Sequence, residues 1–449
     1  MIKRILISFS VMLVALFFAQ MASAKKSGLA FIRDAEIEHT LRSYASPLFI
    51  VAGLNPEDVS IHLINNRVIN AFVAGGQRMF FFTGLLERVE TPGQLKGVIA
   101  HETGHIAGSH QSRTQEALKN ATTKSILGYI LGAAAVFAGG GKAGAAVVSG
   151  SQAVAQRSFL KYSRQQESAA DQASMRYLNE TNNSGRGMLK FLEILGQTEQ
   201  LSYGKVDPYW RSHPISQDRI AALRNQVDKS AYRDVLDTPE EIHALKQIQA
   251  KLYGFTRSLA KTLKKYPHSD QSAEGRYARA IAYFKHPDIE KAEIEIENLL
   301  TEFPDNPFYY ELKGQMLFEN GDPHAAVTPL EIAASYLPYE PLILTLYGTV
   351  LLNTGYPEDD AKAIEVLRTS TRYDPGRSGT WNQLAIAYSR RGDTGNLALA
   401  TSERFLILRQ GKKAIFHAKR AQQNLRTGSP GYLRADDIIS LASRLLKKN

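Results

Sequence analysis

The chain has 449 residues, a formal net charge of +10 and no cysteine. This length is enough for two or three domains, and the lack of cysteine excludes a fold held together by disulfides. A positive charge is compatible with nucleic acid, an anionic membrane surface or solubility alone. Nucleic-acid binding is not expected, because the chain has no dense run of Lys and Arg interleaved with aromatic residues.

Residues 1–24 have the three parts of a cleavable signal peptide. Lys3 and Arg4 precede an apolar run from Ile5 to Phe18, and Ala22-Ser-Ala24 provides small residues for cleavage. The run is short for a membrane-spanning helix, which needs about 20 apolar residues. No cysteine follows the cleavage site, which excludes a lipoprotein anchor, and a chain without cysteine suits an oxidising compartment. We therefore expect an exported, soluble protein.

The first folded elements are expected to be a helix and a small sheet. Apolar residues at helical spacing predict an amphipathic helix over residues 34–52. Alternating and aromatic runs then predict three strands that form a meander. The predicted strands cover residues 59–64, 68–74 and 79–82, with turns at Asn65-Asn66 and Gly75-Gly76.

The next helix carries the main functional motif. Thr91 is a good N-cap and Pro92 a good first residue, so the helix should start there. It contains His101-Glu102-x-x-His105 within an apolar helical pattern. Residues four apart share one helical face, so the two imidazoles can bind one Zn²⁺. Glu102 lies next to them, where it can serve as the general base of a metalloprotease.

A third ligand must come from elsewhere in the chain. Metzincins use H-E-x-x-H-x-x-G-x-x-H, and Gly108 matches the glycine, but Gln111 occupies the last position and His110 lies one residue early. The other common solution is a carboxylate from a second helix. Glu167 and Asp171 are four residues apart and would share one helical face. Glu167 can bind the metal while Asp171 accepts a hydrogen bond from a ligand imidazole.

The segment between the two motifs is weakly polar and rich in glycine. Residues 125–157 contain a run of 17 residues without a charge, interrupted by glycine. This pattern favours two short, closely packed helices over a membrane span. Such a hairpin could shield the cleft or make peripheral membrane contact, or it could be an ordinary core hairpin.

The last part of the chain has an internal repeat. Asp237-Thr-Pro239 is a helix start, and a period of 34 to 37 residues follows it. A 34-residue unit with glycine at the turn and proline after the second helix is the signature of tetratricopeptide (TPR) repeats, which stack into a solenoid with a concave surface. The repeating positions are Phe303-Pro304, Leu337-Pro338 and Asp374-Pro375, then Gly321, Gly355 and Gly392, with Pro357-Glu-Asp as an insertion.

Taken together, these motifs resemble peptidase family M48. The matching residues are His101 to His105, Tyr162 to Asp171, and Ser212-His-Pro214 with Arg219 five residues beyond the proline. Within the family, the chain resembles the periplasmic branch that carries a C-terminal TPR domain. The resemblance covers nearly the whole chain after the signal peptide, and the ordered set of motifs is more specific than any one of them.

The resemblance implies a division of roles at one zinc site per chain. His101, His105 and Glu167 would bind Zn²⁺, Glu102 would be the base, and Asp171 and Arg219 would support the ligands. His213 would lie over the metal, as a removable fourth ligand or as a hydrogen-bond donor to the transition state; alternatively, it precedes Pro214 at a helix start and makes no metal contact. The strand over residues 70–73 would bind substrate at a sheet edge, unless it is an ordinary internal strand.

These expectations define a fold and two alternative functions. The fold is an α+β zincin-like metalloprotease domain with a small sheet, followed by an all-α TPR solenoid, divided as residues 1–24, 25–230 and 231–449. The first function is a periplasmic zinc endopeptidase. By resemblance it would act on misfolded or stalled outer-membrane proteins and bind the barrel-assembly machinery through the TPR domain. The second is a TPR chaperone or scaffold for outer-membrane protein assembly, with a latent or vestigial metal site.

Overall fold

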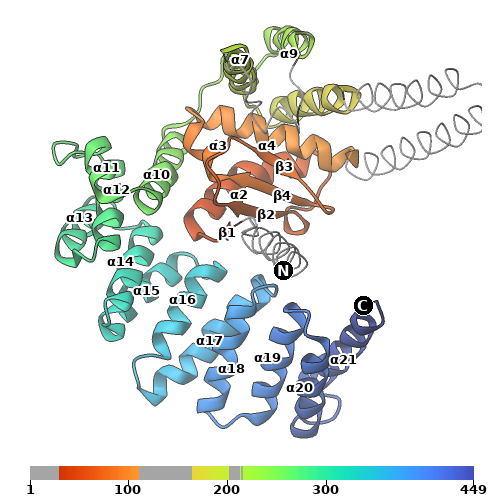
Figure 1. Ribbon diagram of the computed structural model, residues 1–449, viewed down its shortest axis with the longest axis vertical. Coiled ribbons are helices and arrows are strands. Elements are labelled where there is room, and N and C mark those ends of the chain that lie inside the picture. The colour runs from red at the N-terminus through yellow and green to blue at the C-terminus, as the bar shows by residue number, and fades with distance from the viewer. Residues whose placement is uncertain (1–29, 111–163, 202–212, 214–215, 449) are drawn as a thin grey trace, which may run out of the picture.

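The computed structural model describes residues 30–110, 164–201, 213 and 216–448 (Figure 1). The predicted signal peptide at residues 1–24 and the glycine-rich segment at 125–157 lie outside the described residues. The described part has a small mixed sheet near its N-terminus and is otherwise mainly helical. It therefore confirms the expected fold class, an α+β domain followed by a helical solenoid.

The first elements are helix α2 and a sheet of four strands. Helix α2 (Ala35–Val51) starts where Asp34 accepts a hydrogen bond from the backbone N–H of Ile37, and a 3₁₀ turn (Pro56–Asp58) follows it. Its apolar face packs on the sheet within the main core cluster. The strands are β1 (Phe31–Ile32), β2 (Ser60–Ile64), β3 (Ala71–Val73) and β4 (Arg78–Phe82).

The strands do not form the predicted meander. Their order is β1-β2-β4-β3, with β2 and β4 parallel and β3 antiparallel to β4 at one edge. The tertiary contacts of Asn66 explain the difference. Its backbone N–H and C=O bind the Thr83 hydroxyl at 3.1 and 3.0 Å, so the chain after β2 is held at the far end of β4. From there it returns on the outer side of β4 and pairs with it through the turn at Gly75 and Gly76, which both have positive φ.

Helix α4 (Pro92–Ala107) forms the centre of the first domain. As predicted, Thr91 is its N-cap and Pro92 its first residue. Helices pack closely around it because glycine removes side chains at the contacts. A Cβ on Gly104 would lie 3.0 Å from the carbonyl oxygen of Ala170, and one on Gly97 would lie 2.5 Å from the Cβ of Met188. Helix α2, residues 164–180 and α7 (Arg186–Leu201) contact α4. Helix α3 (Thr83–Arg88) precedes it in the chain, and α9 (Gln217–Lys229) packs on α7.

Helix α10 (Pro239–Thr256) joins the two parts of the molecule. It begins with a capping box between Thr238 and Glu241, at the helix start expected from the sequence. Leu245, Ile248 and Leu252 belong to the core cluster of the first domain, while α12 (Ala273–Lys285) packs against the helix as the solenoid begins. One helix thus contributes to both structural units.

The solenoid consists of stacked helix pairs with the expected period. The first helices of successive pairs begin at Ala273, Pro307, Pro341 and Ser378, so the intervals are 34, 34 and 37 residues. Gly321, Gly355 and Gly392 occupy the turns within pairs, with φ of +94°, +81° and +70°. The helices are α11 (Leu259–Lys265), α12 (Ala273–Lys285), α13 (Ile289–Glu302), α14 (Pro307–Glu319), α15 (Pro323–Tyr336), α16 (Pro341–Leu351), α17 (Pro357–Tyr373), α18 (Ser378–Arg390), α19 (Thr394–Ile407), α20 (Gly411–Asn424) and α21 (Pro430–Lys448).

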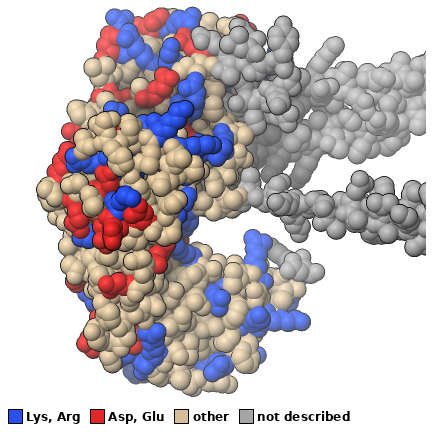
Figure 2. Space-filling view, turned by 60° about the vertical axis from the view of Figure 1, so that its left-hand side comes forward, with Lys and Arg blue, Asp and Glu red and all other residues tan. Residues whose placement is uncertain are grey.

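The solenoid curves from one side of the first domain to below it (Figure 1). Arg33, which lies just before α2, binds Asp374 at the end of α17 at 2.9 Å, and this ion pair links the two parts of the molecule. Acidic and basic side chains mix over the upper part of the molecule, whereas few acidic side chains lie among the basic ones near the C-terminal helices (Figure 2). Among the described residues, no helix combines the length and apolar character that crossing a membrane requires.

Candidate metal centre

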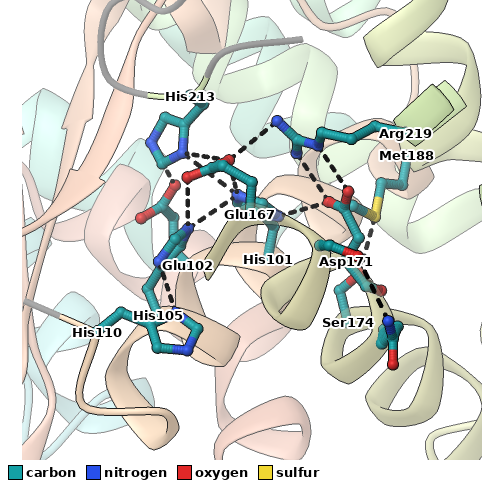
Figure 3. A network of polar contacts seen from close by, with 12 residues as sticks. His101, Glu102, His105, His110, Glu167, Asp171, Ser174, Met188, His213 and Arg219 are labelled. Carbon is teal, nitrogen blue, oxygen red and sulfur yellow. Dashed lines mark hydrogen bonds and ion pairs between the residues drawn. The ribbon is translucent and has the colours of Figure 1, made fainter. Parts of the chain in front are cut away.

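The structure brings all seven predicted site residues into one buried cluster (Figure 3). Helix α4 provides His101, Glu102 and His105, and the helix over residues 164–180 provides Glu167 and Asp171. Arg219 is in the first turn of α9, where Ser216 caps the helix and accepts a hydrogen bond from the backbone N–H of Arg219. His213 approaches the cluster from the segment before α9.

Four of these side chains point their donor atoms at one another. The Nε2 atoms of His101 and His105 are 3.1 Å apart, and the Glu167 carboxylate lies 3.3 Å from the first and 3.4 Å from the second. The Nδ1 atom of His213 is 3.3 Å from Nε2 of His101 and 3.2 Å from Oε2 of Glu167. A tetrahedral zinc with bonds of about 2.0–2.1 Å would place its ligand atoms about 3.3–3.4 Å apart. The spacing therefore fits a metal ion at the centre of the four residues.

The buried charges also fit a divalent cation. Three carboxylates, from Glu102, Glu167 and Asp171, lie in the cluster with the single guanidinium of Arg219. With neutral imidazoles this leaves two uncompensated negative charges in a site where each residue is at most 8% exposed. Buried charge is unfavourable unless it is paired. A divalent metal would neutralise the group.

The pKa shifts of His101 and Glu167 also show that the cluster stabilises positive charge. Burial alone would lower the pKa of His101, but hydrogen bonds with Asp171 and Glu167 outweigh it and raise this pKa to about 10. Burial would raise the pKa of Glu167, but the charge of His213 and hydrogen bonds from His101 and His105 hold it well below its usual range. The carboxylates therefore stabilise positive charge at the centre of the cluster, whether a proton or a metal ion carries it.

Asp171 and Arg219 contact the ligand residues on the side away from the centre of the cluster. Oδ1 of Asp171 lies 3.0 Å from Nδ1 of His101, which leaves Nε2 of this ring facing the centre. Arg219 binds Asp171 through two hydrogen bonds of 2.8 and 2.9 Å and reaches Glu167 at 3.0 Å. One guanidinium thereby orients both acids of the second helix.

Glu102 and His213 face each other on the remaining side of the cluster. Nε2 of His213 is 3.3 Å from Oε1 of Glu102. The Glu102 side chain is fully buried, and apart from this ion pair neither of its oxygens has a hydrogen-bond partner among the described residues. A buried carboxylate with unused acceptors is expected to bind water or a substrate N–H. The position suits a group that exchanges protons with a reacting molecule.

His110 has a position that the sequence motifs did not indicate. Its Nδ1 atom lies 3.1 Å from Nδ1 of His105, on the side of that ring opposite the centre, and Gln166 donates to its backbone carbonyl at 3.0 Å. His110 therefore orients His105 as Asp171 orients His101. The available signal was its place five residues after His105, which by itself only excluded the metzincin spacing.

Peptidases are found among the known proteins that this chain resembles. The model of the family described as "Peptidase family M48" matches residues 32–227. The "Beta-barrel assembly-enhancing protease" of Yersinia pestis is 24% identical over 404 residues, which cover 88% of this chain and 82% of the relative. "Metalloprotease LoiP" of Escherichia coli is 25% identical over 203 residues, or 44% of this chain and 74% of the relative.

Among solved structures, YrrB, described as a TPR protein with an unusual peptide-binding site, covers 39% of this chain and 91% of its own chain. The identity is 19% and the TM-score 0.32. The family match covers both ligand-bearing helices, strands β2 to β4 and α9 as far as residue 227. The match identifies residues 32–227 as a domain of the peptidase family M48 type.

Proposed function

We propose that the chain is a zinc-dependent endopeptidase of the periplasm that acts on misfolded or stalled outer-membrane proteins. The observation that carries the proposal is the set of donor atoms on His101, His105 and Glu167, 3.1 to 3.4 Å apart, with the buried Glu102 beside them. The relatives of Yersinia pestis and Escherichia coli are named as a protease that enhances β-barrel assembly, and this name supports the substrate class. The predicted signal peptide supports the compartment.

The chain's own residues would divide the reaction between them. A zinc ion held by His101, His105 and Glu167 would act as a Lewis acid that polarises a peptide carbonyl and makes water nucleophilic near neutral pH. An Oε atom of Glu102 would take the proton from the attacking water and return it to the leaving amine. Asp171 and His110 would keep the two ligand imidazoles in the required tautomers and orientations.

The sheet offers a place for the substrate backbone. Strand β3 is at the edge of the sheet and packs beside α4, the helix with the HExxH motif. An extended segment added to this edge would be recognised mainly through its backbone. That mode suits an enzyme whose substrates share an unfolded state and not a sequence. The solenoid would bring the enzyme to a partner complex.

The test is hydrolysis of unfolded casein by purified mature protein, combined with measurement of bound zinc. We expect Glu102→Gln to retain zinc and to reduce hydrolysis by about 10²–10⁴-fold, because it removes a general base. His105→Ala should lose both zinc and hydrolysis. Since His213 lies over the site, each variant should also be made in a His213→Ala background.

Full hydrolysis by Glu102→Gln protein would exclude the assigned mechanism. If neither the wild-type protein nor the His213→Ala protein binds zinc or hydrolyses casein, the second function is favoured, a chaperone or scaffold with a vestigial site.

A further inference from the structure

The C-terminal end of the solenoid contains a cavity that the peptidase reaction does not use. It has a volume of about 410 Å³ and lies between α17, α18, α19 and the start of α21. Trp381 and Tyr388 of α18 supply aromatic surface, and Arg368, Arg372 and Arg434 supply guanidinium groups. Its volume is in the range of sites that bind small ligands or a few residues of a peptide.

The arginines of the cavity differ in their pairing. Arg434 binds the buried Glu403 through two contacts of 2.5 and 3.0 Å. Arg368 and Arg372 are exposed, and no acidic side chain of the described part of the chain forms an ion pair with either. They are four residues apart on α17, so their guanidinium groups share one face of the helix. The cavity thus presents two positive charges without a counter-charge.

This end of the chain also carries most of the net charge. Residues 378–449 contain 13 Lys and Arg against 4 Asp and Glu, a balance of +9, whereas the whole chain has a balance of +10. In Figure 2, the lower part of the molecule shows basic side chains on a largely uncharged surface with few acidic ones. The surroundings would attract a negatively charged partner and repel a basic one.

We propose that this cavity binds an acidic segment of a partner polypeptide. Side-chain carboxylates of the segment would bind Arg368 and Arg372, because guanidinium groups match carboxylates in shape and charge. An apolar side chain between the carboxylates would lie on Trp381 and Tyr388. A flat bilayer surface cannot enter a cavity enclosed by four helices, which favours a peptide over anionic lipid. The proposal rests on the docking role suggested above for the solenoid and does not depend on peptidase activity.

The test is fluorescence anisotropy with labelled ten-residue peptides and the full mature chain carrying Glu102→Gln, which prevents cleavage. One peptide contains four glutamates and a phenylalanine; the other has glutamine in place of each glutamate, and both are amidated at the C-terminus. We expect the glutamate peptide to bind at least about tenfold more tightly than the glutamine peptide, and its affinity to fall with added salt. Arg368→Gln combined with Arg372→Gln should weaken the glutamate peptide by at least about tenfold.

The matched control is Arg391→Gln combined with Arg426→Gln, which changes the net charge equally at exposed arginines outside the cavity. Retained affinity in this control supports a specific site, and an equal loss in both double variants overturns it. Equal binding of the two peptides also overturns the proposal, as does displacement of the peptide by vesicles containing phosphatidylglycerol. Casein hydrolysis by the wild-type chain is measured separately, so failure of the peptidase proposal is distinguishable from failure of this one.

Discussion

The carboxylate of Asp171 is held between two partners, Arg219 at 2.8 and 2.9 Å and the Nδ1 atom of His101 at 3.0 Å. The pair fixes the imidazole from behind while its Nε2 atom faces Glu167. Loss of this support should weaken the metal site without removing a ligand.

We therefore expect Asp171→Asn to reduce zinc affinity by about 10–100-fold. Glu167→Gln should reduce it further, because it replaces an anionic ligand with a neutral amide. Competition titration with a zinc-binding dye measures both. An equal loss, or a larger loss in Asp171→Asn, would mean that the roles of the two acids are exchanged.

His213→Ala distinguishes between the two roles proposed for this imidazole. Its Nδ1 atom lies 3.2–3.3 Å from the Glu167 carboxylate and the His101 ring, a position that suits a fourth ligand. A fourth protein ligand would close the site to substrate, so we expect the variant to hydrolyse casein faster than the wild type. If His213 instead donates a hydrogen bond to the transition state, kcat should fall by about 10²–10³-fold with zinc retained. Unchanged zinc affinity and unchanged hydrolysis would exclude both roles.

Glu311→Gln should change how stability depends on pH. Glu311 shares the buried Lys251 with Asp34 and Glu36, at distances of 3.8, 2.9 and 3.3 Å, and Tyr277 donates to Glu36. Burial raises the pKa of Glu311 to about 8, with Asp34 and Glu36 adding to the rise and Lys251 opposing it. Burial also raises the pKa of Glu36.

The folded state holds the Glu311 proton more tightly than the unfolded state. The contribution of this group to folding stability is therefore fully present below the pKa of the unfolded state, about 4.3. That stability is lost as pH rises toward 8. The variant should therefore raise the melting temperature at pH 8 relative to wild type and flatten its decline from pH 5 to 8. The control is Glu290→Gln, an exposed change on α13. A parallel decline in wild type and Glu311→Gln would contradict the prediction.

The last prediction concerns the domain boundary, which we propose to test with two fragments. The sequence places the boundary at residue 230, but Leu245, Ile248 and Leu252 of α10 lie in the core cluster of the first domain. Each buried side chain of this kind contributes about 1.5–3 kcal/mol, and Lys96 of α4 binds Glu241 at 2.9 Å. We expect residues 25–257 to unfold cooperatively and bind zinc.

The shorter fragment, residues 25–238, should melt at a clearly lower temperature because it lacks α10. Thermal unfolding followed by circular dichroism compares the two. Equal melting temperatures would place the boundary before α10, as the sequence suggests.

Local patterns were enough to predict the elements that depend on neighbouring residues. The N-cap at Thr91, the helix start at residues 237–239, the HExxH helix and the 34-residue period follow from local patterns along the chain, and the structure has each of them. Helical spacing by itself also places His101 beside His105 and Glu167 beside Asp171.

Contacts between distant residues were decided by the tertiary structure alone. The strand order depends on Asn66 binding Thr83 across the end of β4, which no local pattern encodes. The orientation of His105 by His110, the pairing of Arg434 with Glu403 and the Arg-lined cavity depend on how helices pack. Sequence spacing fixes what lies on one helical face, because the helix has a regular geometry. It does not determine which faces of different helices and strands pack against one another, because that depends on the packing of the whole core.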